Sequence, residues 1–517
     1  MRSIQAVRAL CMMAVVGTLL AWAHIPASAA QDDLVTVKTG TLRGKVSGEG
    51  RQFLNVPFAA PPTGERRLQP PQPALAWSGV RDARQAGNIC PQAVVLGNED
   101  CLVLNVYTPP AASSRNLPVM VFVPGGAYNL GWGSMYDPAP LVAKGDVIAV
   151  TVNYRVGPLG FLALPGLADE SGTTGNYGTL DQQAALRWVR DNIGAFGGSP
   201  GRVTLFGESA GGHSVCMQLI SPTAAGLFHR AISESGGCVG TDLGPVPAKT
   251  AYARGETFAK AVGCTDPGTM VSCLRRKPAS ELQAAAGNPF PSDGLTWVPA
   301  IDGTVVKEPT RTALEAGRYN KVPLVTGTNK DEGRLFVALQ THLLQLRRAN
   351  AADLEAAIRL RAGQVTDELR KAYPPQAADN ADLALSAVLT DGVFSCPGLS
   401  TARAAASNTG QPVYAYEFAD PEPPLSGIDL FMPLGAYHAS ELLYLFELFD
   451  LNAAQKRLSD QMVTYWTTFA RTGNPNAPGL PRWPAFTSGS AQMQRLAPQG
   501  ITPFTTFAAD HKCALWD

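Results

Sequence analysis

The most constraining feature of this sequence is a pair of short apolar runs separated by a stretch with helical periodicity. The runs cover residues 147–152 and 203–206 and are almost entirely apolar, as expected of strands that are covered on both faces. Between them, within residues 181–193, apolar side chains recur at the three- and four-residue spacing of a helix. A strand, a helix and a second strand in this order form a parallel crossover, so the sequence predicts a wound α/β sheet.

Further elements are expected on both sides of this crossover. Strand-like runs occupy residues 34–37, 102–107, 119–123, 322–326 and 413–418. Helical patterns extend from about residue 341 to 406, as insertions above the sheet, and over residues 458–471. No repeat or linker divides the chain, and we therefore expect a single domain over residues 31–517.

The first 30 residues differ from the rest of the chain. A basic start precedes an apolar run over residues 9–23 and the small residues 27–30, which predicts a signal peptide cleaved near Ala29 or Ala30. The run is shorter than the roughly 20 residues of a membrane-spanning helix, and no later segment is expected to be apolar over a long enough stretch to span a membrane. We expect a secreted or periplasmic protein with no stable membrane anchoring.

The charge balance of the chain excludes several function classes. Lys and Arg number 42 and so do Asp and Glu, and cleavage of the signal peptide removes two arginines. Such a neutral chain is not expected to bind nucleic acid. No His-Glu-x-x-His motif, paired Cys-x-x-Cys motif or phosphate-binding glycine loop with lysine occurs, so we expect neither metal nor cofactor. The oligomeric state is left open.

Eight cysteines remain after cleavage, an even number that predicts disulfides in an exported chain. Short loops close readily, and spacing therefore favours two local bridges, Cys90 with Cys101 and Cys264 with Cys273. We interpret Cys216 and Cys238 as small buried hydrophobic residues. The pairing of Cys216, Cys238, Cys396 and Cys513 is left open.

The pattern Gly-x-Ser-x-Gly occurs twice, around Ser199 and around Ser209. A nucleophile elbow needs a strand before the serine, a helix after it, and a backbone N–H on the next residue. Ser199 follows a loop and precedes Pro200, which has no N–H, so we assign it to a turn. Ser209 follows the run 203–206, precedes a helix-compatible segment and is followed by Ala210. The sequence therefore predicts Ser209 as a nucleophile.

A glycine-rich loop is the candidate for the oxyanion hole. The strand-like run 119–123 continues directly into Pro124-Gly125-Gly126-Ala127-Tyr128. Backbone amides in such a loop can turn inward because no bulky side chain blocks them. We expect this loop to lie beside Ser209 at one edge of the sheet.

The base and the acid follow from the order serine, acid, histidine that is typical of this kind of elbow. Among six histidines, His438 lies on a loop after the run 413–418, whereas His342 lies in a helical pattern and His511 in the tail. The run 322–326 leads to two adjacent carboxylates, Asp331 and Glu332, and spacing leaves both open as the acid.

Taken together, these residues resemble the type-B carboxylesterase and lipase family, the cholinesterase-like α/β-hydrolases, across nearly the whole mature chain. Besides the elbow and the His438 loop, the resemblance is carried by Glu-Asp-Cys-Leu-Val-Leu-Asn at 99–105, Asn-Tyr-Arg-Val-Gly at 153–157, Gly-Leu-Phe-His-Arg-Ala-Ile-Ser at 226–233, Asp-Glu-Gly at 331–333 and Phe-Ala-Arg-Thr-Gly-Asn-Pro at 469–475.

The resemblance implies an α/β-hydrolase fold and hydrolysis of carboxylic esters through an acyl-enzyme. Its implied site residues are Ser209 as nucleophile, Glu332 rather than Asp331 as acid, His438 as base, and Gly126, Ala127 and Ala210 as oxyanion donors. It also supports the two local disulfides. The expected substrates are short- to medium-chain or bulky-alcohol esters, and the alternatives are a lipase acting on longer-chain glycerides or a non-catalytic binding module on the same fold.

Two departures from the family pattern bear on specificity. The family often has His-Gly-Gly-Gly in the oxyanion loop, and here Pro124 and Ala127 replace the first and last residues. The added methyl group is expected to narrow the pocket for bulky alcohols. The loop between Cys90 and Cys101 has only ten residues and no tryptophan, so neither interfacial activation nor choline specificity is expected. Tyr128 and Trp297 are interpreted as either pocket or core residues.

Overall fold

The computed structural model describes residues 33–48, 50–92, 97–110, 116–168, 172–240, 243–288, 296–408, 410–427 and 432–516. The expected signal peptide at residues 1–30 lies outside the described residues.

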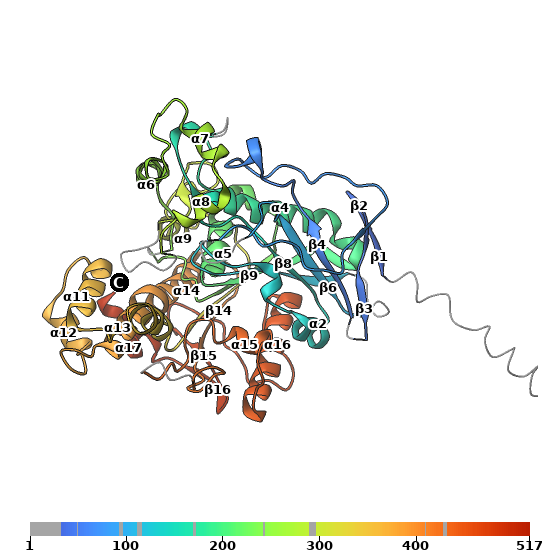
Figure 1. The fold of residues 1–517 in the computed structure, drawn as a ribbon. Coiled ribbons are helices and arrows are strands. Elements are labelled where there is room, and N and C mark those ends of the chain that lie inside the picture. Colours follow the sequence, from blue (N-terminus) through green and yellow to red (C-terminus); the bar gives the residue numbers. More distant parts are fainter. Residues whose placement is uncertain are drawn as a thin grey trace, which may run out of the picture.

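An 11-stranded sheet forms the centre of the protein (Figure 1). Its order is β16-β15-β14-β13-β10-β9-β7-β8-β6-β4-β3, and the strands from β15 to β8 are parallel. The parallel strands are β7 (Leu117–Val123), β8 (Ile148–Val152), β9 (Gly198–Glu208), β10 (Arg230–Glu234), β13 (Leu324–Asn329), β14 (Val413–Phe418) and β15 (Met493–Ala497). Antiparallel strands complete the edges: β3 (Lys45–Ser47), β4 (Gly50–Pro57), β6 (Val103–Thr108) and β16 (Gly500–Phe504). This architecture confirms the predicted α/β class.

Two smaller sheets flank the large one. They pair β1 (Leu34–Val37) with β2 (Gly40–Arg43) and β5 (Val80–Asp82), and β11 (Val246–Pro247) with β12 (Ala300–Ile301). The α-helices outside residues 333–408 are α2 (Ala139–Gly145), α3 (Gly157–Phe161), α4 (Tyr177–Asn192), α5 (Ala210–Ile220), α6 (Ala248–Ala261), α7 (Met270–Arg276), α8 (Ala279–Ala284), α9 (Thr310–Glu315), α15 (Leu442–Leu445), α16 (Ala453–Thr472) and α17 (Phe507–Asp510).

Strand β7 shows why the central runs are apolar throughout. Val119 and Val121 belong to the hydrophobic cluster that contains α4 and α5, whereas Met120 and Phe122 belong to the cluster that contains α16. Successive side chains of a strand point to opposite faces, so a strand covered by helices on both faces needs apolar residues at every position.

A helical layer follows β13, and we call residues 333–395 the cap. It contains α10 (Gly333–Val337), η6 (Ala338–Leu344), α11 (Ala351–Ala362), α12 (Asp367–Ala372), α13 (Asp382–Leu389) and η7 (Thr390–Ser395), after which α14 (Cys396–Asn408) returns to the sheet. The cap has a hydrophobic cluster of its own, which includes Leu354, Ile358 and Val388. Figure 1 shows α11, α12 and α13 grouped together to one side of the sheet.

The segment α13–η7–α14 corrects one expectation from the sequence. Residues Asp382–Asn408 form one helical segment of 27 residues that contains an 18-residue window with a mean hydropathy of 1.3, long and apolar enough to cross a membrane by length and composition alone. In the folded protein, however, 72% of its apolar window is buried. Its apolar side chains pack against the sheet and the cap.

Most element boundaries differ from prediction by a few residues, and two of these differences have a local cause. Ser199 lies within β9 rather than in a turn, because the strand starts at Gly198, which pairs with Leu117 of β7. Helix α16 starts several residues earlier than expected, where the Asn452 side chain accepts hydrogen bonds from the amides of Ala454 and Gln455. The single domain over residues 31–517 stays a prediction, although strands from β3 to β16 share one sheet.

The structure contains four disulfides. Cys90–Cys101 and Cys264–Cys273 form the two expected local bridges. The interpretation of Cys216 and Cys238 as unpaired was wrong: they form a bridge over 22 residues, because α5 packs against the segment that follows β10. The fourth bridge joins Cys396 to Cys513 over 117 residues, a separation at which spacing carries no information about contact.

Candidate active site

The carboxyl ends of the parallel strands meet at one edge of the sheet. The elbow follows β9, the glycine loop follows β7, and the two candidate acids follow β13. The loop that carries His438 follows β14 farther along the chain. Parallel strands place their carboxyl ends at a common edge, which is where open α/β sheets bind their ligands.

Ser209 occupies a strained turn between β9 and α5, with φ 57° and ψ −124°. This conformation is costly for a residue with a side chain, and such strain is typical of a nucleophile elbow. The turn requires close backbone crossings: a Cβ on Gly207 would lie 2.6 Å from the Val123 carbonyl oxygen, and one on Gly211 only 2.0 Å from it. Glycine is therefore required on both sides of Ser209.

The loop after β7 runs beside Ser209. Gly126 has φ 110° and Ala127 has φ 54°, and both residues line the same cavity as Ser209. The Gly126 carbonyl is engaged by the amides of Asn129 and Leu130, each at 2.9 Å, so the peptide plane is fixed. Ala210, at the first position of α5, has an amide that the helix itself leaves without an acceptor.

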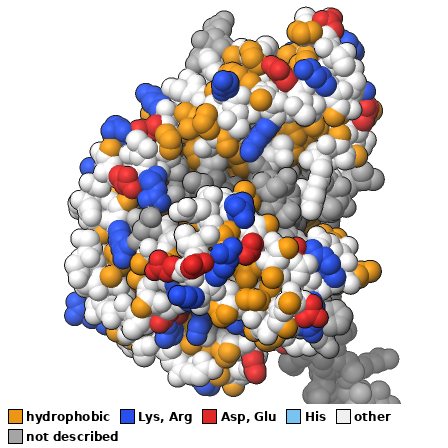
Figure 2. All heavy atoms as spheres, turned by 90° about the vertical axis from the view of Figure 1, so that its left-hand side faces the viewer, with side chains coloured by type: hydrophobic (Ala, Val, Ile, Leu, Met, Phe, Trp, Pro, Cys, Tyr) orange, Lys and Arg blue, Asp and Glu red, His pale blue; other side chains and the backbone are white. Residues whose placement is uncertain are grey.

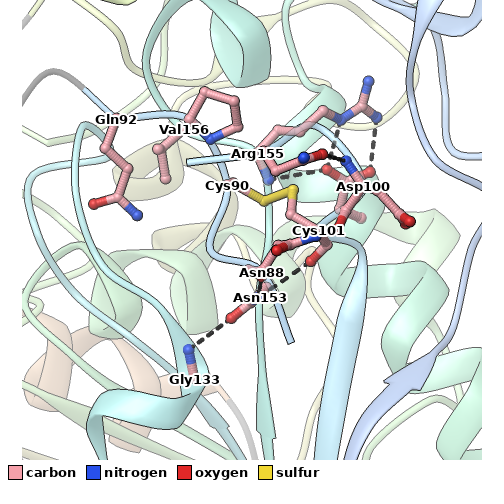
Figure 3. Close-up of a disulfide and its surroundings, with 12 residues drawn as sticks. Asn88, Cys90, Gln92, Asp100, Cys101, Gly133, Asn153, Arg155 and Val156 are labelled. Carbon is pink, nitrogen blue, oxygen red and sulfur yellow. Dashed lines mark hydrogen bonds and ion pairs between the residues drawn. A yellow bond between two sulfur atoms is a disulfide. The ribbon is translucent and has the colours of Figure 1, made fainter. Parts of the chain in front are cut away.

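A disulfide-bridged loop supports the glycine loop. The Gln92 side chain donates to the Gly131 carbonyl at 2.9 Å and accepts from the Gly131 amide at 3.1 Å. Figure 3 shows Asn153 near the Cys90–Cys101 bridge; its side chain donates to the Cys101 carbonyl at 3.1 Å and accepts from the Gly133 amide at 2.8 Å. The bridge thus helps to hold the segment that follows Gly126 and Ala127.

The geometry distinguishes the two candidate acids. Glu332 Oε2 lies 2.6 Å from His438 Nδ1, and its Oε1 accepts from Ser235 Oγ at 2.5 Å and from the Asn329 amide at 2.7 Å. Asp331 turns away, pairing with Arg334 at 2.6 Å. Only Glu332 is therefore placed to orient the imidazole.

His438 lies at the wall of the cavity that Ser209 also lines. The rings of Phe336 and Phe394 each lie 4.8 Å from the imidazole, and its Nε2 is 3.1 Å from Glu208 Oε1. Two aromatic contacts and the bond to Glu332 hold the ring at this position. The other two histidines considered lie elsewhere: His342 is 3.1 Å from Asp382, and His511 contacts two other carboxylates.

Buried glutamates surround the site. Burial, followed by the charges of Glu332 and Glu234, raises the pKa of Glu208 well above its usual value. Burial also raises the pKa of Glu234 to about 8, although its hydrogen bond from Trp466 opposes this. The pKa of Glu441 is likewise raised by burial and then by its acidic neighbours. Burial and the neighbouring carboxylates act in the same direction, and both favour the protonated forms of these glutamates.

The cavity beside Ser209 has a volume of about 800 Å³. The cap supplies most of its apolar wall, including Leu335, Leu389, Val393 and Phe394. Farther out, Arg347 and Arg359 of the cap line it as well. Figure 2 shows the face that carries the cap, where hydrophobic and charged side chains are interspersed. An apolar chamber with a reactive residue at its base suits a small, largely apolar ligand.

Several residues of the site were missed by the sequence analysis. Ser235 directly follows strand β10, and Glu208 is the last residue of the neighbouring strand β9. Their position at the carboxyl ends of these strands could have indicated that they lie at the site. Phe336 and Phe394 gave no signal, because they come from different cap helices. Tyr128 and Trp297 are buried core residues, only 1% and 3% exposed, and do not line the cavity. Within the described residues, no group of three or more His, Cys, Asp or Glu side chains could hold a metal ion.

Comparison with known proteins identifies the family. The model of the carboxylesterase family matches residues 31–516. The chain belongs to the carboxylesterase family. It is 36% identical to acylcarnitine hydrolase of Mus musculus over 86% of this chain and 82% of that protein, and 35% identical to liver carboxylesterase 1 of Oryctolagus cuniculus over 94% and 93%. It is also 35% identical to cocaine esterase of Homo sapiens over 89% of this chain and 87% of that protein.

Membership of this family establishes the class of reaction. The protein is a carboxylic ester hydrolase with the α/β-hydrolase fold, and its substrates are small-molecule esters. The carboxylesterase fold accounts for the 11-stranded sheet, and the edge described above is the place where its chemistry is expected.

Proposed function

We propose that this carboxylesterase forms an acyl-enzyme on Ser209, with His438 as base and Glu332 as acid. Glu332 accepts from Nδ1 of His438, so the neutral imidazole has its lone pair on Nε2, and His438 and Ser209 line the same cavity. His438 takes the Ser209 proton as the oxygen attacks the ester carbonyl. The observation that supports this scheme most directly is the 2.6 Å contact between Glu332 and His438 beside a strained serine.

The oxyanion of the tetrahedral intermediate would be bound by the backbone amides of Gly126, Ala127 and Ala210. The glycine loop and the start of α5 lie on either side of Ser209, which supports this assignment. Glu208 Oε1, 3.1 Å from Nε2, is a second carboxyl group beside the imidazole. Water then attacks the acyl-enzyme and releases the acid.

The test is covalent labelling combined with substitution. A fluorophosphonate probe should label the wild-type protein, with the label located on Ser209 by peptide mass spectrometry. Ser209→Ala should abolish labelling and lower kcat on p-nitrophenyl acetate by a factor on the order of 10⁶. Turnover by Ser209→Ala close to the wild-type rate would contradict the acyl-enzyme scheme, and absent labelling with no turnover would favour the non-catalytic alternative.

The substrates are proposed to be short- to medium-chain or bulky-alcohol esters. A lipase acting on longer-chain glycerides remains the second candidate, because an apolar cavity of about 800 Å³ has room for a longer acyl chain. Rates on p-nitrophenyl esters of increasing acyl length separate the two. A maximum at long chains, with a jump above the solubility limit of the ester, would favour the lipase.

Export to the periplasm or the medium is also part of the proposal. Four disulfides are consistent with folding in an oxidising compartment. The signal peptide is proposed to be cleaved near Ala29 or Ala30. N-terminal sequencing of the exported protein tests the cleavage site, and a mature protein that starts with Met1 would contradict it.

A further inference from the structure

The C-terminal tail reaches the wall of the active-site cavity through one buried histidine. His511 is 5% exposed and lies between two carboxylates from different parts of the fold. Its Nδ1 is 2.6 Å from Asp391 Oδ1, and its Nε2 is 3.0 Å from Glu417 Oε1. Asp391 belongs to η7 of the cap and Glu417 to β14 of the sheet, so the imidazole joins these two elements.

The turn η7 is the part of the cap that is closest to the chemistry. It is a π-helical turn between α13 and α14, a geometry that is often found at functional sites. Val393 and Phe394 of η7 line the cavity, and the Phe394 ring lies 4.8 Å from the His438 imidazole. A shift of η7 would therefore move a substrate-facing wall and an aromatic neighbour of the base.

Other residues of the tail hold the same turn. The Tyr373 hydroxyl donates to Asp391 at 2.8 Å and accepts from Trp516 Nε1 at 2.7 Å. Cys513 is bridged to Cys396, the residue that follows η7. The ring of Trp516 lies against Gly392, where an added Cβ would be only 3.1 Å away. Figure 1 shows the C-terminus beside α11 and α13.

We propose that His511 is a positioning residue for the substrate-facing wall of the cavity. It fixes η7 to the sheet, and through η7 it sets where Val393 and Phe394 stand. The inference rests on the proposed function at Ser209 and goes beyond it, because it assigns a role in substrate selection to a residue outside the cavity.

The charges around His511 give this contact a pH dependence. The groups that face it are Asp391 and Glu417, with Arg495 bonded to Glu417 at 2.8 Å and Asp510 3.4 Å from Arg495. The Tyr373 hydroxyl donates to Asp391, and Lys512 Nζ lies 5.0 Å from the centre of the Tyr373 ring. Burial lowers the pKa of His511, but the two carboxylates outweigh burial and raise it to about 9. The imidazolium is thus present at neutral pH, and the bridge is lost as the pH rises through about 9. Asp391 then keeps its hydrogen bond from Tyr373, whereas Glu417 keeps its pair with Arg495.

The experiment measures kcat/KM on p-nitrophenyl acetate and p-nitrophenyl octanoate between pH 7 and 10 for the wild type and for His511→Gln. At pH 7, His511→Gln should lower the octanoate-to-acetate ratio by about fivefold, because a displaced wall affects the longer acyl group more. The wild-type ratio should fall as the pH passes about 9, and that of His511→Gln should not.

His342→Gln is the matched control, because His342 is a buried histidine of the cap that pairs with Asp382 rather than with η7. It should leave the ratio and its pH profile unchanged. If His511→Gln does not fold, the double variant Asp391→Asn/His511→Gln removes the unpaired carboxylate and is measured instead. A ratio that is independent of residue 511 and of pH, or an equal change in His342→Gln, would overturn the inference. Fluorophosphonate labelling of each variant separates this outcome from failure of the proposed function, which would abolish labelling in the wild type too.

Discussion

The sheet edge and the cap build the site in different ways. At the edge, Ser209 and Glu332 stand on short connections that directly follow strands β9 and β13, and backbone crossings as close as those at Gly207 and Gly211 fix the turn. The cap has its own hydrophobic cluster, and it forms the cavity wall with side chains from several helices, held by distant contacts such as Cys396–Cys513. The comparison indicates that the chemistry depends on strand register, whereas substrate selection depends on how the cap is packed and tied down.

The largest effect should come from the sheet edge, where two adjacent carboxylates make different contacts. Glu332→Gln should lower kcat on p-nitrophenyl acetate by about 10⁴-fold, because the imidazole loses the carboxylate that orients it and stabilises its charge. Asp331→Asn is the matched control and should change kcat by less than about tenfold, since Asp331 makes a partly exposed pair with Arg334. Equal losses in the two variants would mean that the edge does not place the acid as proposed.

The long-range disulfide that ties the cap to the C-terminal tail should stabilise the protein more than a local disulfide outside the cap. By loop-closure entropy, removing Cys396–Cys513, which closes 117 residues, should lower the free energy of unfolding by about 5 kcal/mol. Removing Cys264–Cys273, which closes 9 residues, should lower it by about 2.5 kcal/mol. Urea unfolding of the paired Cys→Ser variants measures both values. The reverse order would show that the long bridge ties together segments already held by other contacts.

The buried glutamates of the sheet edge should make stability depend on pH. The pKa of Glu234 is about 8 in the folded protein against 4.5 as the ordinary value, so the folded state retains a proton that the unfolded state releases between these pH values. Glu234 therefore lowers stability progressively as the pH rises from about 4.5 to 8. Glu234→Gln should reduce this slope of the unfolding free energy by up to about 1.4 kcal/mol per pH unit.

Urea unfolding of Glu234→Gln at pH 5, 6, 7 and 8 measures that slope. The exposed Glu315→Gln is the control and should leave it unchanged, because the Glu315 side chain is 56% exposed and pairs only with Arg311 in a surface helix. Parallel stability curves for the wild type and Glu234→Gln would show that Glu234 ionises in the folded protein as it does in water.

The smallest expected effect concerns the cap wall. Val393→Phe should lower the ratio of kcat/KM for octanoate to that for acetate by about tenfold, because the larger ring fills cavity volume that the longer acyl chain needs. Leu344→Phe, at a cap position that is 67% exposed, should leave the ratio unchanged. A similar loss on both esters with Val393→Phe would place Val393 next to the reacting group rather than along the acyl chain.

Local patterns in the sequence were enough to predict which residues lie at the catalytic edge of the sheet. The strand that leads to Ser209, the free amide of Ala210 and the glycine loop are features of adjacent residues, and the backbone geometry of an elbow restricts which residues can occupy them. Strands β1 and β14 were predicted with the boundaries they have in the structure. The error at Ser199 has the same origin, because a proline and glycines suggested a turn where pairing with β7 extends the strand.

By itself, the sequence determined the α/β sheet, the strand–turn–helix around Ser209 and the order in which serine, acid and histidine occur. The tertiary structure decided which of Asp331 and Glu332 faces His438, which cysteines pair beyond local spacing, and how the cap encloses the cavity. The physical reason is the separation along the chain of the residues that interact. Hydrogen bonds and steric limits between neighbouring residues depend on residues that are adjacent in the sequence. Contacts such as that of His511 with Asp391 form only when packing brings together residues 120 positions apart.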